Sequence, residues 1–302
     1  MLKTSFMRVL ARRDNRGLRQ RSKEEVLAPD TKTQVDSLLR GVARAPRSLL
    51  MLDYDGTLAP FCKNRESAFP YPGISAILQE IVRTGRTRVV IVSGREASDV
   101  IPLLDISPLP EIWGLHGLQR LNPDGSTELP PLHPQTVSEL AAAENWLRYQ
   151  HLEHTAELKT GSIAVHWRGL DECEAESVRG RVLMGWTPLA KYTRLDLLEF
   201  DGGVEIRAHK ADKGAAVNTI LNEMNSGVPA AYFGDDTSDE KAFQALNSRG
   251  LSVLVRPRWR RTAAQLWLKP PDELLDFLKR WLQACQEHDA LNNNDTTMAV
   301  NA

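Results

Sequence analysis

The sequence has few cysteines, no strong excess of charge and no long apolar run. Its 302 residues include three cysteines, Cys62, Cys173 and Cys285, which are far apart and lack the short spacing of a zinc site. We therefore expect free thiols in a reducing, cytoplasmic compartment. No apolar segment is long enough to span a bilayer, and the formal net charge of −1 gives no general attraction to nucleic acid or to an anionic membrane. An anionic substrate would therefore have to be bound by a local cluster of cations.

The two ends of the chain differ in composition from its middle. Residues 1–45 are rich in arginine, which predicts a basic, partly disordered extension with a short helix at 34–42. Residues 288–302 are polar and predict a disordered tail.

Two different patterns lie between these ends. In 46–125 and 209–287, apolar strand-like runs alternate with helical periods, and polar residues follow the strands. This order predicts an α/β fold with a Rossmann-like, doubly wound parallel sheet as the catalytic core. Residues 126–208 begin with a proline-rich linker and continue with helices and strands in another order, which indicates an inserted α+β cap with an open-faced sheet.

The most informative stretch is the apolar run that ends in Asp53-Tyr54-Asp55-Gly56-Thr57. It predicts a buried strand that leads into a tight turn, at the sheet edge where α/β proteins bind ligands. Asp53 and Asp55 alternate about Tyr54, so an extended backbone directs both carboxylates to one side, where their repulsion favours a bound cation or proton. Gly56 permits close approach of the backbone, and the N–H groups around the turn form a candidate anion site. An ordinary Asp-Gly turn is the alternative interpretation.

Three further polar motifs follow predicted strands or begin helices. Lys213 stands at a helix start, which is unfavourable for a cation and therefore favours a functional anion partner. A serine such as Ser93 is also common as a helix N-cap, and an acidic run can simply form a solvated loop. Their joint occurrence in this order favours one shared site. The motifs are Ser93-Gly94-Arg95, Asp212-Lys213-Gly214 and Gly234-Asp235-Asp236-Thr237-Ser238-Asp239.

Together these residues fit phosphoryl transfer through a covalent intermediate. Asp53 would attack phosphorus and form an aspartyl-phosphate, while Asp55 would protonate the leaving alkoxide and then activate water. Ser93 would donate a hydrogen bond to a phosphate oxygen. Lys213 would neutralise the charge that Asp53 and the phosphate bring together.

The same acids predict a site for Mg²⁺, which prefers oxygen ligands in octahedral geometry. We expect the ligands to be the carboxylates of Asp53 and Asp235, the backbone carbonyl of Asp55, and waters. Asp236 and Asp239 are expected farther out, where they hold a water ligand or orient the lysine.

Six strings, from the segment between about 47 and 286, carry a family resemblance. They are Leu52-Asp53-Tyr54-Asp55-Gly56-Thr57-Leu58-Ala59-Pro60, Val92-Ser93-Gly94-Arg95, Gly114-Leu115-His116-Gly117, Val165-His166-Trp167-Arg168, Glu205-Ile206-Arg207 and Gly234-Asp235-Asp236-Thr237-Ser238-Asp239-Glu240. With these strings the chain resembles the haloacid dehalogenase-like superfamily with a large cap, and within it the trehalose-6-phosphate phosphatases. The resemblance implies Mg²⁺-dependent hydrolysis of trehalose 6-phosphate to trehalose and phosphate, as a step of trehalose biosynthesis. It also implies a functional link to a trehalose-phosphate synthase.

The resemblance further implies which residues bind the substrate. Glu157, Lys159 and Glu205 look like the acids and base that hydrogen-bond the distal glucose, since a carboxylate accepts from two hydroxyls at once. The alternative for the first two is a solvated pair on a strand. Residues expected near the phosphate or the proximal ring are Arg95, His116 and Arg207. The complete expected set is Gly56, Thr57, Gly94, Arg95, His116, Glu157, Lys159, Glu205 and Arg207.

Three other functions share parts of this pattern. A phosphatase for sucrose phosphate or for a glycosyl-phosphoglycerate would use the same core residues with a different cap. A phosphosugar mutase would share the nucleophile but retain the phosphate in a bisphosphate intermediate. A non-catalytic sugar-phosphate sensor, or a regulatory partner of a synthase, is disfavoured because Asp53, Asp55, Lys213 and Asp235 are all present.

Overall fold

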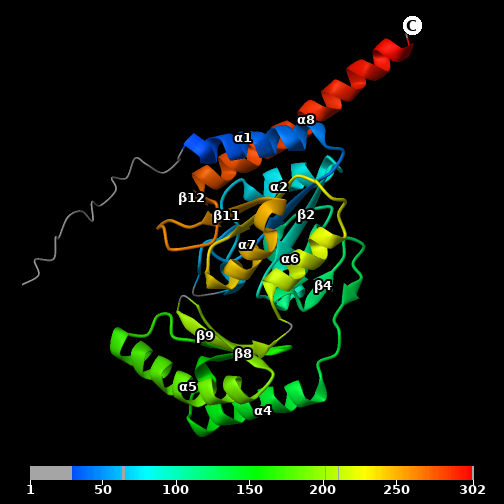
Figure 1. The fold of residues 1–302 in the computed structure, drawn as a ribbon. Helices are drawn as coiled ribbons and strands as arrows, with labels where there is room; N and C mark the ends of the chain where they lie inside the picture. The colour runs from blue at the N-terminus through cyan, green and yellow to red at the C-terminus, as the bar shows by residue number, and fades with distance from the viewer. Residues whose placement is uncertain (1–28, 63–64, 201, 210, 301–302) are drawn as a thin grey trace, which may run out of the picture.

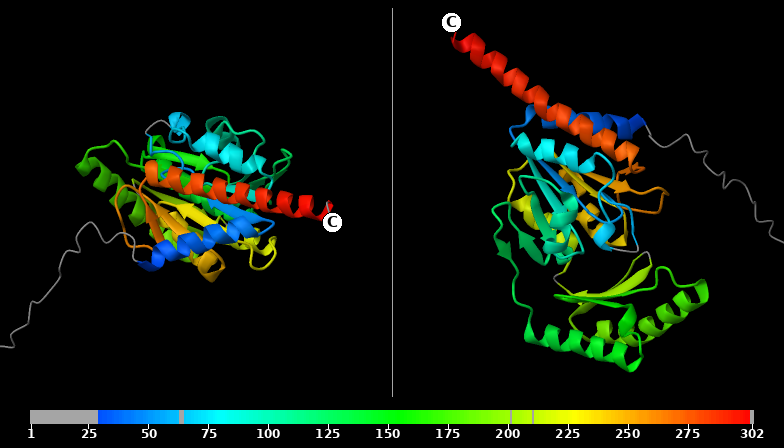
Figure 2. Two further views of the ribbon diagram at one scale, coloured as in Figure 1. Left: turned by 90° about the horizontal axis from the view of Figure 1, so that it is seen from above. Right: turned by 180° about the vertical axis from the view of Figure 1, so that it is seen from behind.

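The computed structural model describes residues 29–62, 65–200, 202–209 and 211–300, and it arranges their strands in two sheets. Figure 1 shows the larger sheet with its helices above the smaller one, and the right-hand view in Figure 2 shows the same separation from behind. The predictions for residues 1–28 and 301–302 lie outside the described residues. Within the described part of the chain, none of the helices combines the length and apolarity needed to cross a bilayer.

The core is an eight-stranded sheet in the order β12-β11-β10-β1-β2-β3-β4-β5. Neighbouring strands from β12 to β3 are parallel, and β4 and β5 add an antiparallel edge. The predicted α/β core with a mainly parallel, doubly wound sheet is therefore confirmed. Its strands are β1 (Ser48–Leu52), β2 (Thr87–Val92), β3 (Glu111–Gly114), β4 (Gln119–Leu121), β5 (Thr127–Glu128), β10 (Ala230–Gly234), β11 (Leu251–Val255) and β12 (Leu266–Leu268).

Helices cover both faces of this sheet because its central strands are apolar on both sides. Along β1, Leu50 and Leu52 pack in one hydrophobic cluster, whereas Leu49 and Met51 pack in another on the opposite face. The helices of the first face are α1 (Pro29–Arg44), α2 (Ile74–Arg83), α3 (Ala97–Leu104) and α8 (Asp272–Val300). Those of the second face are α6 (Lys213–Asn222) and α7 (Glu240–Leu246).

The cap is a four-stranded antiparallel sheet in the order β6-β7-β9-β8, with two helices packed on one face. Val204 and Ile206 of β9 pack in one cluster with Val182 and Trp186 of a cap helix. Glu205 lies between them and therefore points to the other face, which is turned toward the core. The cap elements are α4 (Pro134–Tyr149), β6 (Ala156–Lys159), β7 (Ser162–His166), α5 (Glu172–Tyr192), β8 (Leu195–Phe200) and β9 (Gly203–Ala208).

The predicted boundary between the core and the cap at 126 is wrong. β5 pairs with β4 in the core sheet, so the cap does not start at 126, and its first helix begins at Pro134. The two residues of β5 are exposed and have no apolar pattern that could reveal a strand. The predicted helix at 34–42 is confirmed but is longer, because α1 packs on α8 and buries Val35, Leu39 and Val42 at helical spacing.

The prediction that the tail is disordered is also wrong for the residues up to Val300. The backbone of α8 remains helical to this residue, well beyond the predicted start of the tail at 288. Residues 287–300 contain neither glycine nor proline, so the sequence has no residue that stops the helix.

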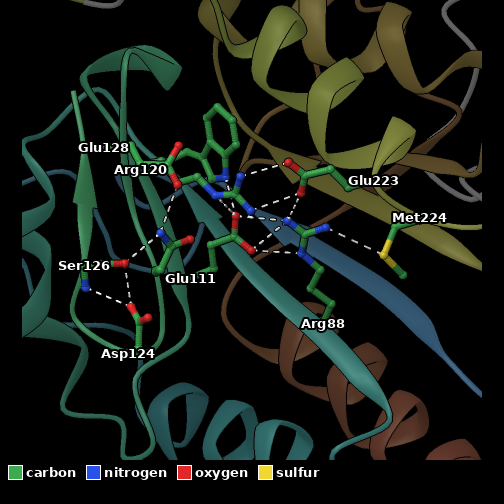
Figure 3. A network of polar contacts seen from close by, with 10 residues as sticks. Arg88, Glu111, Arg120, Asp124, Ser126, Glu128, Glu223 and Met224 are labelled. Atoms are coloured by element: carbon green, nitrogen blue, oxygen red, sulfur yellow. Dashed lines mark hydrogen bonds and ion pairs between the residues drawn. The ribbon is translucent and has the colours of Figure 1, made fainter. Parts of the chain in front are cut away.

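A buried carboxylate network ties together β2, β3, β4 and α6 near the amino ends of β2 and β3 (Figure 3). Glu111 accepts from Arg88 Nε at 2.9 Å and from Trp113 Nε1 at 2.7 Å, and it lies 2.8 Å from Arg120 Nε. Glu223 accepts from the same two arginines at 2.6 and 2.8 Å. The network lies at the amino ends of these strands, whereas the predicted site residues, such as Ser93 after β2, follow the carboxyl ends. It therefore stabilises the core at a distance from the predicted site.

Candidate active site

The carboxyl ends of β1 and β10 meet a cavity of about 550 Å³ between the core and the open face of the cap sheet. This volume is typical of pockets that bind small organic molecules. Asp53 directly follows β1 and Asp235 directly follows β10, and because the strands are parallel neighbours the two residues lie side by side. The lining residues are Asp53, Asp55, Phe61, Cys62, Arg65, Gly94, His116, His154, Thr155, Ala156, Glu157, Lys159, His166, Arg168, Leu170, Leu198, Phe200, Glu205, Lys213, Asp235, Asp236 and Ser238.

Two donors hold Asp53 at the core end of this cavity. Its carboxylate accepts from Lys213 Nζ at 2.6 Å and from Thr57 Oγ1 at 3.1 Å. Burial raises the pKa of Asp53, the charge of Lys213 lowers it, and the charge of Asp239 raises it further. The resulting pKa is about 7. Burial disfavours the charge of Lys213, but Asp239 and Asp53 outweigh it and raise the lysine pKa above its ordinary value. The result is an oriented carboxylate beside a permanently charged amine.

Asp235 lies against the turn that follows Asp53. Gly56 has a φ of +85°, and a Cβ atom at this position would lie 2.3 Å from Asp235 Oδ2. The turn therefore needs glycine both for its backbone conformation and for the approach of the carboxylate. Burial raises the pKa of Asp235 well above its usual value, and the charge of Asp53 adds to the shift. A cation bound between the two acids would relieve this repulsion.

A third buried carboxylate, Asp239, holds the side chain of Lys213 and the backbone of the loop that directly precedes Asp239. Oxygens of Asp53, Asp235 and Asp239 all lie within 4.8 Å of one another. However, Asp239 Oδ1 accepts from Lys213 Nζ at 2.8 Å and from Tyr232 OH at 2.6 Å, and Oδ2 accepts from two backbone N–H groups of the preceding loop at 3.1 Å. Each oxygen of Asp239 already accepts two hydrogen bonds, whereas each oxygen of Asp53 accepts one, so Asp53 and Asp235 are the carboxylates of this group that are open to a cation.

Asp55 lines the same cavity, but an arginine holds both of its oxygens. Arg95 Nε and Nη2 donate to them at 2.7 and 2.6 Å, and Arg95 is only 3% exposed. Ser93 follows β2 and is buried, and its hydroxyl accepts from the backbone N–H of Arg95 at 3.1 Å. Arg95 therefore contacts the Asp55 carboxylate and does not line the cavity where the resemblance places it.

The cap end of the cavity contains a buried carboxylate surrounded by donors. Glu205 accepts from Ser162 Oγ at 2.8 Å and from Lys159 Nζ at 3.3 Å, and it lies 2.7 Å from His116 Nε2. Burial alone would raise the pKa of Glu205, but the contacts with His116 and Lys159 lower it well below its ordinary value. Burial lowers the pKa of His116 by more than Glu205 raises it, so at neutral pH the uncharged ring donates from Nε2. A Cβ atom at Gly94 would lie 2.6 Å from His116 Cε1, so this glycine makes room for the ring.

Glu157 lies at the edge of the same end. It forms an ion pair with Arg65 of the core, and its Oε2 lies 3.0 Å from His166 Nε2 and 3.8 Å from Lys159 Nζ. Burial would raise its pKa, but the hydrogen bond from His166 and the charges of Lys159 and Arg65 lower it to about 2. Glu157 is thus an ionised acceptor for hydroxyl groups in the cavity.

The structure brings most of the sequence-predicted residues together, but some do not reach the cavity surface. The predicted residues that line it are Asp53, Asp55, Gly94, His116, Glu157, Lys159, Glu205, Lys213, Asp235 and Asp236. Those that lie behind it are Gly56, Thr57, Ser93, Arg95, Arg207 and Asp239. Arg207 is buried, and its Nε and Nη1 have no hydrogen-bond partner among the described residues. It follows Glu205 by two positions on β9 and therefore shares its face, but it lies past the edge of the cavity.

Several lining residues had no signal in the sequence. Phe61 and Arg65 come from the core segment after the Asp53 motif, and Phe200 ends β8 of the cap. Arg168, two residues after β7, belongs to one of the strings that carry the resemblance, but no role was expected for it. The guanidinium carbon of Arg168 lies 4.3 Å from the Phe61 ring centroid. Loops have no periodic pattern, so the only available clue was the short distance in sequence from Phe61 to Asp53.

Comparisons with known proteins agree with this geometry. The family model of trehalose-phosphatase matches residues 51–267. A trehalose 6-phosphate phosphatase of Zea mays, RA3, is 30% identical over 278 residues, which cover 83% of this chain and 74% of that protein. A probable trehalose-phosphate phosphatase of Oryza sativa subsp. japonica is 29% identical over 255 residues, covering 80% of this chain and 67% of the rice protein. The structure of the C-terminal domain of a trehalose-6-phosphate phosphatase from C. albicans has a similar fold, with a TM-score of 0.71 at 21% identity over 82% of this chain and 96% of that one.

Proposed function

Because this chain belongs to the trehalose-phosphatase family of phosphoric monoester hydrolases, we propose that it hydrolyses trehalose 6-phosphate to trehalose and inorganic phosphate. The observation that supports this most is that one cavity has two chemically different ends. The core end, with Asp53 beside Lys213, suits a phosphate group. The cap end, with Glu157 and Glu205 among donors, suits the hydroxyls of a sugar. The maize relative is named for the same substrate.

In the proposed reaction, Asp53 attacks the phosphorus atom and the bond from phosphorus to the sugar oxygen breaks. Thr57 and Lys213 orient the attacking carboxylate, and the lysine charge reduces its repulsion from the phosphate. The leaving sugar oxygen takes a proton from Asp55. Asp55 then accepts a proton from the water that attacks the aspartyl-phosphate, which releases phosphate and restores Asp53. For these transfers Asp55 has to give up at least one of its contacts with Arg95.

We further propose that Mg²⁺ is the cofactor. The donor set fits this ion, because Asp53 and Asp235 offer buried carboxylate oxygens side by side; burial raises the pKa of both, and the charge of Asp53 adds to the shift of Asp235. The backbone carbonyl of Asp55 and waters would supply the remaining oxygens, and Asp236 lines the cavity where it could hold one of those waters. When bound, the ion would offset the charge of the phosphate and the carboxylates.

A phosphate-release assay with purified protein tests the proposal. The substrates are trehalose 6-phosphate, sucrose phosphate, a glycosyl-phosphoglycerate and p-nitrophenyl phosphate, each with Mg²⁺ and with EDTA. We expect metal-dependent release that is fastest from trehalose 6-phosphate. Faster release from another phosphosugar would assign the enzyme to that substrate, and retention of phosphate in a bisphosphate would indicate a mutase. Binding of phosphosugars without any turnover would leave the sensor function.

A further inference from the structure

Arg65 links the cap and the core across the cavity, although the proposed reaction gives it no role. It begins the short helix η1 (Arg65–Ser67) of the core, and its guanidinium forms an ion pair with Glu157 of the cap sheet. Glu157 Oε1 faces Arg65, whereas Oε2 faces His166 and the cavity. The two side chains of the pair are 34% and 30% exposed, so a ligand can reach them. One oxygen of Glu157 thus remains available for a sugar hydroxyl while the other stays with the core.

The backbone of Arg65 makes a second contact, with Arg95, which in turn holds Asp55, the proposed acid and base. The carbonyl oxygen of Arg65 accepts from Arg95 Nη1 at 2.8 Å, and the other two donors of Arg95 hold the oxygens of Asp55. The Arg95 guanidinium also lies over the ring of Tyr54, 5.5 Å from its centroid. Arg95 is buried, and it connects the backbone of residue 65 directly to the Asp55 carboxylate.

The same core loop carries another contact with the cap. Phe61 lies beneath the guanidinium of Arg168, which comes from the segment after β7. The cap therefore contacts this part of the core at two points, one a cation–π contact and the other an ion pair, and both core residues line the cavity.

We propose that Arg65 is a positioning residue that couples recognition of the sugar by the cap to the orientation of Asp55. This inference rests on the proposed phosphatase function. A disaccharide in the cap end holds Glu157, Glu157 holds the side chain of Arg65, and the carbonyl of Arg65 fixes Arg95. Asp55 is then presented to the leaving sugar oxygen in one orientation. A phosphate ester without a sugar leaves Glu157 unengaged and gains nothing from this chain of contacts.

Steady-state kinetics of Arg65→Ala with two substrates tests the coupling. For trehalose 6-phosphate we expect kcat to fall roughly tenfold, within the range of typical coupling between sites. For p-nitrophenyl phosphate, which does not reach the cap and whose leaving group needs little protonation, kcat should change less than about twofold. Arg65→Lys, which keeps the charge, should recover part of the lost rate. Arg83→Ala removes an exposed arginine paired with Glu80 on α2 and serves as the matched control.

A double variant separates coupling from two independent effects. If Arg65 acts through Glu157, Glu157→Ala alone should lower kcat for trehalose 6-phosphate about as much as Arg65→Ala does, and adding Arg65→Ala to it should lower kcat by less than about twofold further. The inference is overturned if the two effects multiply, if both substrates lose rate equally, if only KM rises, or if nothing changes. An unmodified enzyme that turns over no phosphosugar would instead reject the proposed function, and the inference with it.

Discussion

Replacing Asp53 by asparagine should abolish turnover and yet make the metal-free protein more stable at alkaline pH. Asparagine has the shape of aspartate and keeps an oxygen that accepts from Lys213, but it has no charge and cannot form the phosphoryl ester. The buried, ionised carboxylate of Asp53 opposes folding when no cation is bound, because its pKa is raised by burial. Activity and stability should therefore change in opposite directions.

The size and the sign of the effect follow from the pKa values. An ordinary aspartate titrates near 3.8, whereas the pKa of Asp53 in the folded protein is raised to about 7. Between these values the folded state keeps a proton that the unfolded state has released, so stability falls as the pH rises and the loss is complete above about 7. A difference of about three pKa units corresponds to roughly 4 kcal/mol. The asparagine variant avoids this loss.

Urea unfolding in EDTA, at about pH 5 and about pH 8, measures the difference. The stability of Asp53→Asn relative to the unmodified protein should increase by a few kcal/mol between the two pH values. Asp105→Asn is the control, because Asp105 is exposed and its left-handed backbone also suits asparagine. A relative stability that does not change with pH would refute the reasoning about burial, and an active Asp53→Asn enzyme would refute the nucleophile.

Three further substitutions test separate parts of the structure. Glu157→Ala should raise KM for trehalose 6-phosphate about tenfold and hardly change that for an aryl phosphate, because only the disaccharide reaches the cap; equal effects in steady-state kinetics would exclude Glu157 from sugar recognition. Glu111→Ala should lower the free energy of unfolding in urea by about 3 kcal/mol without changing KM, because Arg88 and Arg120 lose a buried partner; unchanged stability would contradict this. Gly56→Ala should weaken Mg²⁺ activation at least tenfold in a metal titration of activity, because its Cβ would occupy the place of the Asp235 carboxylate; an unchanged midpoint would show that the turn can adapt.

The sequence could predict the core of the candidate site because strand topology determines it. Asp53 and Asp235 each directly follow an apolar run, and the carboxyl ends of the parallel strands in a doubly wound sheet lie at the same edge. Lys213 could be placed because it begins a helix whose apolar period is clear. In each case the apolar pattern identifies a strand or a helix, and the functional residue lies directly at the end of that strand or the start of that helix.

The remaining features depend on tertiary contacts that have no local signature. Arg65 and Phe61 lie in a loop, and their positions depend on where the cap meets the core. Arg207 shares a strand face with Glu205 but lies beyond the cavity, since alternation gives the face of a residue and not the extent of a pocket. Arg95 was expected near the phosphate or the proximal ring, and nothing in the sequence indicated that its guanidinium would form a bidentate pair with Asp55.

The one-sided packing of the cap sheet separates the residues that keep it folded from those that face the ligand. Val204 and Ile206 pack against the cap helices, whereas the side chain of Glu205 between them lies on the opposite face of the sheet and lines the cavity. Selection for a different sugar can therefore act on every second position of a few short strands. The intervening positions need not change, so the residues that face the cavity can be replaced without rebuilding the interior of the cap.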